Sequence, residues 1–265
     1  MDKVKPLKRF GQNFLRDQNI IKKIVEEINP QQDESIIEIG PGQGALTEKI
    51  LEKNSNLISV EIDKRAIADL RTRYTNLNII EFDFLELDLN KFTLNSEQKL
   101  RVIGNIPYNI TSPILFKLFE NNTLINDAIF MVQLEVAQRM TARQGSKDYG
   151  ILSVLISYFG NAKLVFKVSP NVFYPKPKVY SAVIHIYFDP LKVDKEINSL
   201  FKAVVKASFG NRRKTLKNSL GNSIFADINF SNSDVDLSLR AEQLDLDQFL
   251  KLTNFAYRQL NHNVH

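Results

Sequence analysis

The chain has 265 residues, 43% hydrophobic and 25% charged, and its 18 Phe and 8 Tyr supply a core, which excludes a disordered or fibrous protein. It contains no Cys and three His, which excludes disulfides, thiolate metal sites and a cysteine nucleophile and argues against a histidine-built metal site. Its net charge is +5, and its longest apolar stretch, Ile151–Phe159, is far shorter than the roughly 20 residues that span a bilayer. No targeting segment follows the basic first residues, so we expect a soluble protein of the reducing cytoplasm.

The first 190 residues alternate between helical spacing of apolar residues and short apolar runs. Gln18–Ile28 has helical spacing, and Ser35–Ile39 is typical of a buried strand that ends in glycines. Further strands are predicted over 57–62, 78–82, 100–103, 128–132, 163–168 and 181–188, and further helices over 45–53, 65–74, 113–119 and 135–141. Strands separated by helices indicate βαβ units, so we expect an α/β fold with a mostly parallel sheet and helices on both faces.

The pattern changes near Asp189–Pro190, after which only helical segments are predicted, over 197–208, 213–220 and 245–260. We therefore expect two domains, an α/β domain over residues 1–190 and a small all-helical domain over residues 191–265.

The positive charge is concentrated in three segments. From Ile197 to Ala226 there are six Lys and Arg and no acid, and the remaining 29 Lys and Arg balance 30 acids. The segment from Arg139 to Lys178 has seven basic residues against Asp148 alone, and the first 16 residues add five more. This distribution favours a polyanion partner, because each neutralised phosphate releases a counterion. A phospholipid surface is the alternative, although no basic amphipathic helix with aromatic anchors is present.

A glycine loop joins the first predicted strand to a helix. The glycines from Gly40 to Gly44 let the backbone approach a ligand, and the helix N-terminus offers free N–H groups. Glu61 ends the next strand, where a carboxylate can bind two ribose hydroxyls, and Asp83 ends the third, where it could bind an adenine amino group. These residues predict a pocket for an adenosine-containing ligand. The loop also satisfies the dinucleotide-binding spacing, so a nicotinamide-dependent oxidoreductase is an alternative.

The segment Asn105-Ile106-Pro107-Tyr108 follows the fourth predicted strand and is suited to activating an exocyclic amine. The Asn105 side-chain oxygen and the Ile106 carbonyl could accept the amine N–H groups as the nitrogen becomes pyramidal. Pro107 restricts the backbone of Ile106, which holds that carbonyl in place. Tyr108 offers a stacking face for a base that has left its stack.

Several motifs together resemble the ribosomal RNA adenine N6-dimethyltransferase family, which uses S-adenosylmethionine. They are QNFL at 12–15, EIGPGQGALT at 38–47, VEID at 60–63, DF at 83–84 and GNIPYNI at 104–110. Three later segments, over 168–182, 209–220 and 240–242, are similar to the kasugamycin-sensitivity (KsgA-type) branch, which modifies small-subunit rRNA. The erythromycin-resistance branch, which modifies large-subunit rRNA, remains the alternative within the family. The resemblance covers about Arg9 to Phe255.

The resemblance implies a Rossmann-like methyltransferase fold and assigns roles to individual residues. The S-adenosylmethionine site would be lined by Asn13, Leu15, Gly40, Glu61, Asp83 and Asn105. The catalytic residues would be Asn105, Ile106, Pro107 and Tyr108. Of these, Asn105, Ile106 and Tyr108 would face the target adenine, and Phe173 would stack on its other side. Lys176 departs from the family, which often has proline there. The rRNA-binding residues of the C-terminal domain would be Arg212, Arg213, Lys214 and Lys217.

The reaction implied by the resemblance is direct transfer of methyl groups to N6 of two adjacent adenosines in the 3′-terminal hairpin loop of small-subunit rRNA. No metal and no covalent intermediate are needed, and the substrate would be an immature small subunit whose biogenesis the protein assists. We expect a cytoplasmic monomer without a membrane partner. A non-catalytic rRNA-binding assembly factor is a further alternative, against which the intact site residues argue.

Overall fold

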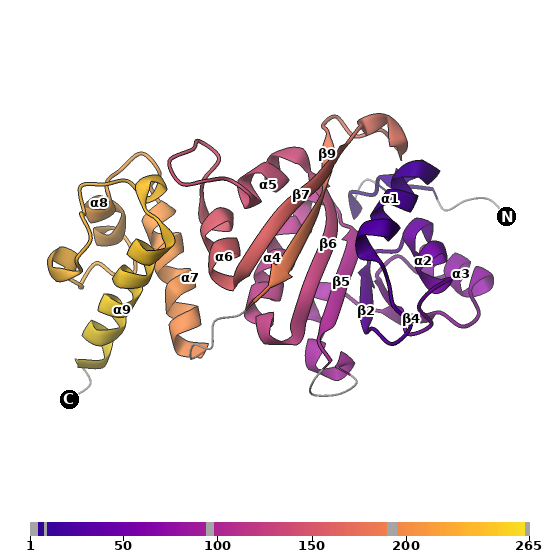
Figure 1. The fold of residues 1–265 in the computed structure, drawn as a ribbon, viewed down its shortest axis with the longest axis horizontal. Coiled ribbons are helices and arrows are strands. Elements are labelled where there is room, and N and C mark those ends of the chain that lie inside the picture. The colour runs from indigo at the N-terminus through magenta and orange to yellow at the C-terminus, as the bar shows by residue number, and fades with distance from the viewer. Residues whose placement is uncertain (1–4, 8–9, 94–97, 190–194, 263–265) are drawn as a thin grey trace. The chain divides into compact units, whose positions relative to one another are not determined.

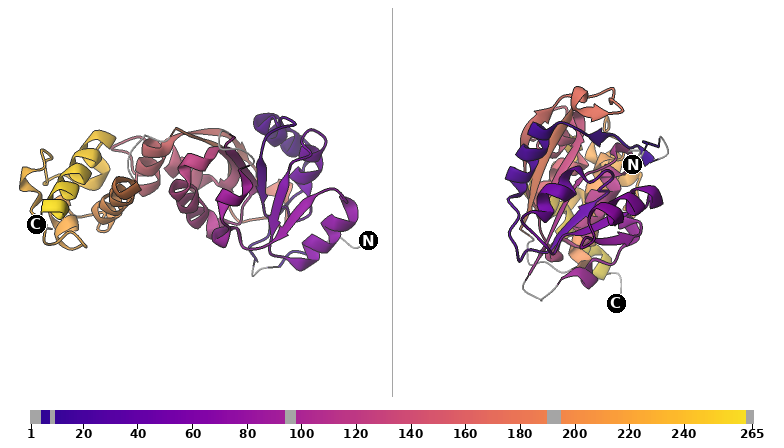
Figure 2. Two further views of the ribbon diagram at one scale, coloured as in Figure 1. Left: turned by 90° about the horizontal axis from the view of Figure 1, so that it is seen from below. Right: turned by 90° about the vertical axis from the view of Figure 1, so that its right-hand side faces the viewer.

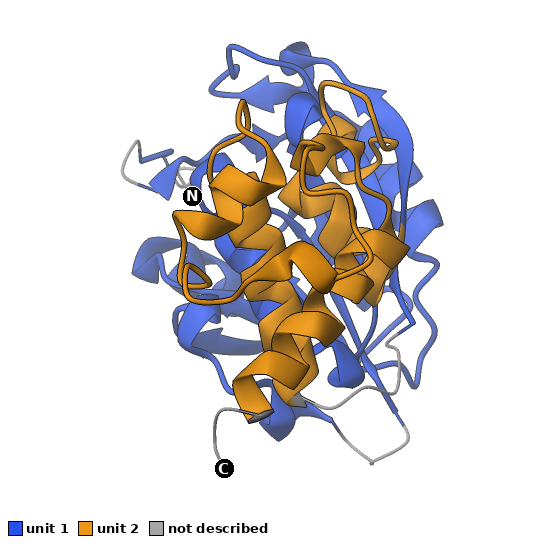
Figure 3. Ribbon diagram, turned by 90° about the vertical axis from the view of Figure 1, so that its left-hand side faces the viewer, with its two compact units in different colours: residues 1–137, 162–189 blue, residues 138–161, 190–265 orange. Residues whose placement is uncertain are grey.

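The computed structural model describes residues 5–7, 10–93, 98–189 and 195–262 (Figure 1). The chain forms two compact units (Figure 3): unit 1 comprises Met1–Ala137 and Ala162–Asp189, and unit 2 comprises Gln138–Asn161 and Pro190–His265. The second unit therefore contains residues 138–161 in addition to the C-terminal segment expected from the sequence.

The core of unit 1 is a seven-stranded sheet with the order β4-β3-β2-β5-β6-β9-β7. Strands β2 to β6 pair in parallel, and β9 pairs with β6 antiparallel, with Ile129 opposite His185. The strand bounds are β2 Ile36–Ile39, β3 Ile58–Glu61, β4 Asn78–Glu81, β5 Leu100–Asn105, β6 Ile125–Gln133, β7 Gly160–Val168 and β9 Ser181–Phe188. The expected mostly parallel sheet is confirmed.

The helices of unit 1 follow from the direction in which the chain crosses the sheet. From β2 the chain proceeds outward through α2 and α3 to β4, and it then returns to place β5 and β6 on the other side of β2. Right-handed crossovers in opposite directions put α2 and α3 on one face and α4 on the other (Figure 2). The helix bounds are α1 Gln18–Ile28, α2 Ala45–Leu51, α3 Lys64–Arg73 and α4 Thr111–Glu120, together with α5 Leu134–Met140, which continues into unit 2.

Helix α1 shows how the sequence sets local structure. Asp17 caps its N-terminus by accepting from the backbone N–H of Asn19 and Ile20 at 2.9 and 3.0 Å, and the left-handed Asn29 ends it. Its buried side chains lie three and four positions apart, so a single stripe packs into the core beside α2. These side chains are Ile21, Ile24, Val25 and Ile28.

A two-stranded sheet absent from the sequence-based prediction joins distant parts of unit 1. Strand β1 (Phe14–Leu15) pairs antiparallel with β8 (Phe173–Tyr174), and the Arg16 N–H donates to the Val172 carbonyl at 2.9 Å. A strand of two residues gives no periodic pattern, which explains why it was not predicted.

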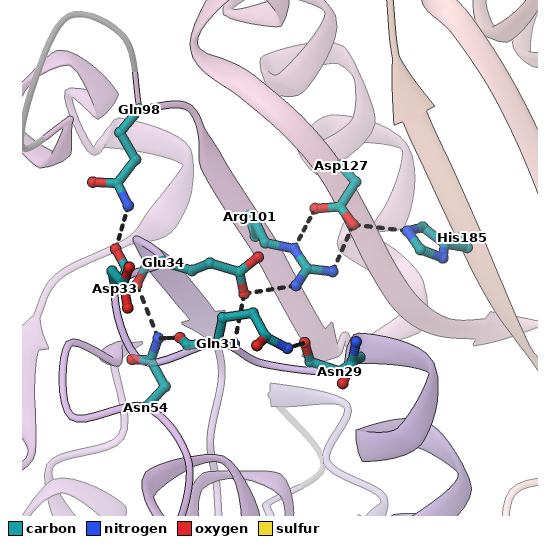
Figure 4. Close-up of polar contacts among 9 residues, drawn as sticks. All are labelled: Asn29, Gln31, Asp33, Glu34, Asn54, Gln98, Arg101, Asp127 and His185. Carbon is teal, nitrogen blue, oxygen red and sulfur yellow. Dashed lines mark hydrogen bonds and ion pairs between the residues drawn. The ribbon is translucent and has the colours of Figure 1, made fainter.

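A buried ion-pair network crosses the sheet of unit 1 (Figure 4). Arg101 in β5 donates to both carboxylate oxygens of Asp127 in β6 at 2.8 Å and to Glu34 at 2.8 Å. His185 in β9 lies 2.8 Å from Asp127 and 2.7 Å from Glu27 of α1. Burial opposes ionisation of Asp127, but the hydrogen bonds from His185 and Arg101 hold its pKa below the usual value. The network links four elements through polar groups that are all partnered.

Unit 2 is helical and has an aromatic core. Its helices are α6 Ile151–Phe159, α7 Lys195–Phe209, α8 Leu216–Gly221 and α9 Leu246–His262. Helix α6 packs on α7 and α9, and the ring of Tyr158 stacks on Phe201 with centroids 3.8 Å apart. This contact explains why residues 138–161 belong to the C-terminal unit. None of the helices in the described ranges is both long and apolar enough to cross a membrane.

Candidate functional site

A cavity in unit 1 lies where the strand order reverses between β2 and β5. Parallel strands that leave this point in opposite directions open a crevice at their carboxyl ends, which is where open α/β sheets bind ligands. The N-terminal segment before α1 forms the rest of the wall. The cavity is lined by residues 10–15, 38–43, 45–46, 60–62, 82–84 and 105–110. All six residues predicted to bind the methyl donor, and all four predicted catalytic residues, lie in its wall.

The glycine loop is built for close approach of a ligand. Gly40 has φ +61°, and an added Cβ would meet no atom within 4 Å, so the backbone faces open space. Its N–H donates to the Val60 carbonyl at 2.9 Å, which fixes the loop to β3. An L side chain at this position would be strained and would enter the space beside the cavity wall. The loop can therefore hold the backbone against a ligand.

Two buried carboxylates give the cavity its charge. Glu61 at the end of β3 accepts from the backbone N–H of Ile62 and Asp63 at 2.9 Å and of Gly42 at 3.1 Å. Glu38 in β2 accepts from the hydroxyls of Thr47 at 2.6 Å and Ser59 at 3.1 Å. Burial raises the pKa of both groups, that of Glu38 to about 7. A ligand that carries positive charge would favour the ionised form of both carboxyl groups.

Glu38 was not among the site residues predicted from the sequence, although its carboxyl group is one of these two. The signal is visible in retrospect, because Glu38 is the single charged residue within the buried strand Ile36–Ile39. A buried charge in a strand interior is costly unless it serves a site or a partner.

The rim of the cavity combines an exposed acid with apolar side chains. Asp83 is exposed and its carboxylate accepts from the Leu85 N–H at 2.8 Å. Ile62 and Phe82 also line the cavity, although they are 47% and 43% exposed. Exposed apolar side chains beside a hydrogen-bonding acid suit the flat rings of a nucleobase.

The Asn105 side chain is oriented by a contact with the N-terminal segment. The Asn105 amide nitrogen donates to the Asn13 carbonyl at 2.9 Å, which leaves its side-chain oxygen as the acceptor. Because a carbonyl only accepts, the amide nitrogen must be the end that faces Asn13. The Tyr108 hydroxyl lies 2.7 Å from the Ser181 hydroxyl, and burial raises the pKa of the phenol. Tyr108 is thereby a neutral, anchored ring.

Phe173 differs from the other predicted site residues. Its side chain is 5% exposed, lies in the same core cluster as Leu15, and does not line the cavity. Successive side chains of a strand point to opposite faces, so the pairing of β8 with β1 buries Phe173 and leaves its neighbour Tyr174 49% exposed. Stacking of Phe173 on a base stays a prediction, and it requires the ring to leave this core.

The predicted rRNA-binding residues lie together in unit 2 but are not equivalent. Arg212, Arg213, Lys214 and Lys217 are all exposed. Arg212 also donates to Glu242 at 3.2 Å and to the carbonyls of Lys147 and Tyr149, which holds the loop before α6. The other three make no ion pair with the described part of the chain. Arg213, Lys214 and Lys217 are therefore available to bind a polyanion.

Within the described ranges, no group of three or more His, Asp or Glu side chains is arranged to hold a metal ion. The residues of the cavity instead fit a cationic adenosine derivative. Two carboxylates would offset its charge, the open space at Gly40 would admit it, and Asp83 would bind its base.

Comparisons with known proteins are consistent with this arrangement. The profile of the family described as ribosomal RNA adenine dimethylase matches residues 4–258. Ribosomal RNA small subunit methyltransferase A of Chlorobium phaeobacteroides is 46% identical over 245 residues, which cover 92% of this chain and 91% of that protein.

Two solved structures are similar over nearly the whole chain. A dimethyladenosine transferase from Plasmodium falciparum has a TM-score of 0.73 and 27% identity, covering 90% of this chain and 95% of that one. The 23S rRNA methyltransferase ErmE has a TM-score of 0.67 and 26% identity, covering 92% and 100%. These similarities confirm the expected Rossmann-like methyltransferase fold.

Proposed function

Because the chain belongs to the ribosomal RNA adenine dimethylase family, we propose that it transfers methyl groups from S-adenosylmethionine to N6 of two adjacent adenosines in the 3′-terminal hairpin loop of small-subunit rRNA. The observation that carries this proposal is the Asn105 turn: Asn105 and Ile106 line the same cavity as Glu38 and Glu61, and the Asn13 carbonyl holds the Asn105 amide nitrogen. Residues that can accept the amine N–H groups and carboxylates that can offset a cationic donor therefore line one cavity. The relative named for small-subunit modification, at 46% identity, favours that substrate over the large subunit.

When bound, S-adenosylmethionine supplies an electrophilic methyl group. The chain contributes binding and orientation. Gly40 and Glu61 would hold the donor, and Asn105 and Ile106 would accept the two amine N–H groups, so that the nitrogen lone pair is directed at the methyl group. Tyr108 would stack on the flipped base. We propose Arg213, Lys214 and Lys217 as rRNA contacts, and an immature small subunit in the cytoplasm as the substrate of a monomeric enzyme.

The proposed function is tested with methyl-labelled S-adenosylmethionine and separate small and large ribosomal subunits from cells that lack both modifications. Label in dimethyladenosine of the small subunit alone is the expected result. Label on large-subunit RNA would assign the protein to the erythromycin-resistance branch. Binding of the methyl donor with no label on either subunit would favour an assembly factor.

The affinity for S-adenosylmethionine should rise with pH. Burial raises the pKa of Glu38 to about 7, and the positive charge of the donor would favour the ionised carboxylate, so binding would release a proton. From pH 6 to pH 8 the dissociation constant should fall about tenfold, because only a small fraction of Glu38 is ionised at the lower pH. Titration calorimetry between pH 6 and pH 8 measures this change in the dissociation constant.

Glu38→Gln is the matched control, because its amide oxygen still accepts from Thr47 and Ser59 but carries no proton that titrates. Any titration of the ligand itself affects both proteins equally. An identical pH profile for the wild type and Glu38→Gln would refute the role of this carboxylate.

The salt dependence of small-subunit binding should weaken when Arg213, Lys214 and Lys217 are replaced together by Ala. Each lost phosphate contact lowers the slope of log K against log salt by about 0.7–0.9, so a decrease of about 2–3 is expected. Arg212 is left intact because it holds the loop before α6. A triple variant of Lys22, Lys23 and Lys53, which are exposed on unit 1, is the charge-matched control. Equal slopes for the two variants would exclude this face.

A further inference from the structure

Exposed apolar side chains of unit 1 occur in the cavity wall and on a segment that pairs with part of that wall. Among the described residues, eight large hydrophobic side chains are exposed, and two of these, Ile62 and Phe82, line the cavity. Three more lie on one segment between β7 and β9: Tyr174 at 49%, Val179 at 44% and Tyr180 at 57% exposed (Figure 1, top). An exposed apolar cluster of this kind is typical of a binding surface.

The backbone of this segment is fixed to the site. Tyr174 pairs with Phe14 of β1, one residue after Asn13, whose carbonyl holds the Asn105 amide. At the other end, the Tyr180 carbonyl accepts from the Leu134 N–H at 2.9 Å. Ser181, the next residue, contacts the Tyr108 hydroxyl. Tyr174 is therefore paired with the residue that follows Asn13, and Tyr180 directly precedes the residue that contacts Tyr108.

The same segment is positively charged. Lys176 and Lys178 are exposed, and no acid occurs between Val168 and Phe188. The guanidinium carbon of Arg16 lies 4.1 Å from the centroid of the Tyr174 ring, an arrangement that places a cation beside an exposed aromatic. Aromatic rings interleaved with cations match the bases and phosphates of a single strand.

We propose that Tyr174 and Tyr180, with Arg16, Lys176 and Lys178, form a stacking platform for the nucleotides that flank the target adenosine. The proposal rests on the proposed function for the identity of the RNA. A base that leaves its stack for the cavity deprives its neighbours of a stacking partner. The two tyrosine rings replace that partner, and the three cations neutralise the adjoining phosphates. The platform thereby selects a target adenosine whose neighbours are unpaired.

The test compares two double variants that differ only in aromatic character. Tyr174→Leu with Tyr180→Leu keeps apolar bulk but removes both stacking faces, and Tyr174→Phe with Tyr180→Phe keeps the rings. The affinity for a labelled oligoadenylate of about 12 nucleotides and the KM and kcat for methyl transfer to small subunits are measured for each. Affinity for S-adenosylmethionine and thermal unfolding show that the site and the fold are intact.

The leucine pair should weaken oligoadenylate binding and raise KM on the order of tenfold per lost stacking contact, with kcat nearly unchanged, and the phenylalanine pair should stay within about twofold of wild type. Equal binding by the two pairs would overturn the platform. So would a loss confined to intact subunits with normal binding of bare RNA, since that would indicate a protein partner. If wild type methylates neither subunit but the leucine pair alone loses oligoadenylate binding, the proposed function fails and the platform stands.

Discussion

Replacing Asn105 by Ala is expected to lower kcat for adenosine methylation by about 10²–10³-fold while binding of the small subunit stays close to that of wild type. The Asn105 amide is held by the Asn13 carbonyl, so its oxygen is already oriented when the amine arrives. Removing a preoriented acceptor costs stabilisation in the transition state that the Ile106 carbonyl alone does not restore. Single-turnover transfer at saturating S-adenosylmethionine measures the effect, since Asn105 is also expected to contact the donor.

Asn105→Asp is the informative companion variant. Its carboxylate keeps the acceptor but has no N–H for the Asn13 carbonyl, and two oxygens would face each other where the amide nitrogen now lies 2.9 Å away. We expect this variant to be impaired as well, because the acceptor is no longer held in place. A turnover rate for Asn105→Ala within a few-fold of wild type would refute the amine-orienting role.

The second large effect is on stability. Replacing Arg101 by Met is expected to lower the free energy of unfolding by about 3–5 kcal/mol, because the buried Asp127 then loses its bidentate cationic partner and keeps only the contact with His185. The Arg101 and Asp127 side chains are 10% and 4% exposed, so water does not take over the lost contacts. Urea unfolding at neutral pH measures the change.

An exposed ion pair provides the control. Lys64 lies 3.2 Å from Glu81, but its side chain is 83% exposed, so Lys64→Met should cost less than about 1 kcal/mol. The pKa of Asp127 is lowered in the folded state, so its contribution is present above its usual value of 3.8 and is lost as the pH falls below it. The stability difference between wild type and Arg101→Met should therefore shrink in acid. A constant difference across that range would show that the lost packing of Arg101, and not its charge, is responsible.

Local features of the sequence were sufficient for most of the elements. The predicted bounds of α1 match the structure, and the β9 strand and the three C-terminal helices lie within two or three residues of their predicted positions. Helix α1 has apolar residues at helical spacing and a capping Asp17, and the other segments have regular apolar patterns, so local information is enough. Helix α6 was not predicted, because its continuous apolar run has no polar face and gives no helical pattern.

Part of the candidate site could likewise be predicted from the sequence, and part of it could not. The residues at the ends of β2, β3 and β5 were found from the sequence because parallel strands place their carboxyl ends together. Glu38 contacts Thr47, Asn13 holds the Asn105 amide, and Ser181 contacts Tyr108. The two residues of each contact lie 9 to 92 positions apart in the chain. No local pattern encodes such contacts.

The sequence by itself determined the α/β class, the adenosine-binding edge, the Asn105 turn and the position of the basic segments, because each rests on local spacing or on a motif. The tertiary structure alone decided which of these side chains are buried, which are exposed, and to which unit a segment belongs. Pairing of β8 with β1 buries Phe173 and exposes Tyr174, and packing of α6 on α7 assigns residues 138–161 to the C-terminal unit. Likewise, a contact with Glu242 commits Arg212 to its own unit. Each of these outcomes depends on a partner far away in the chain, and a partner is chosen by the free energy of packing the whole fold.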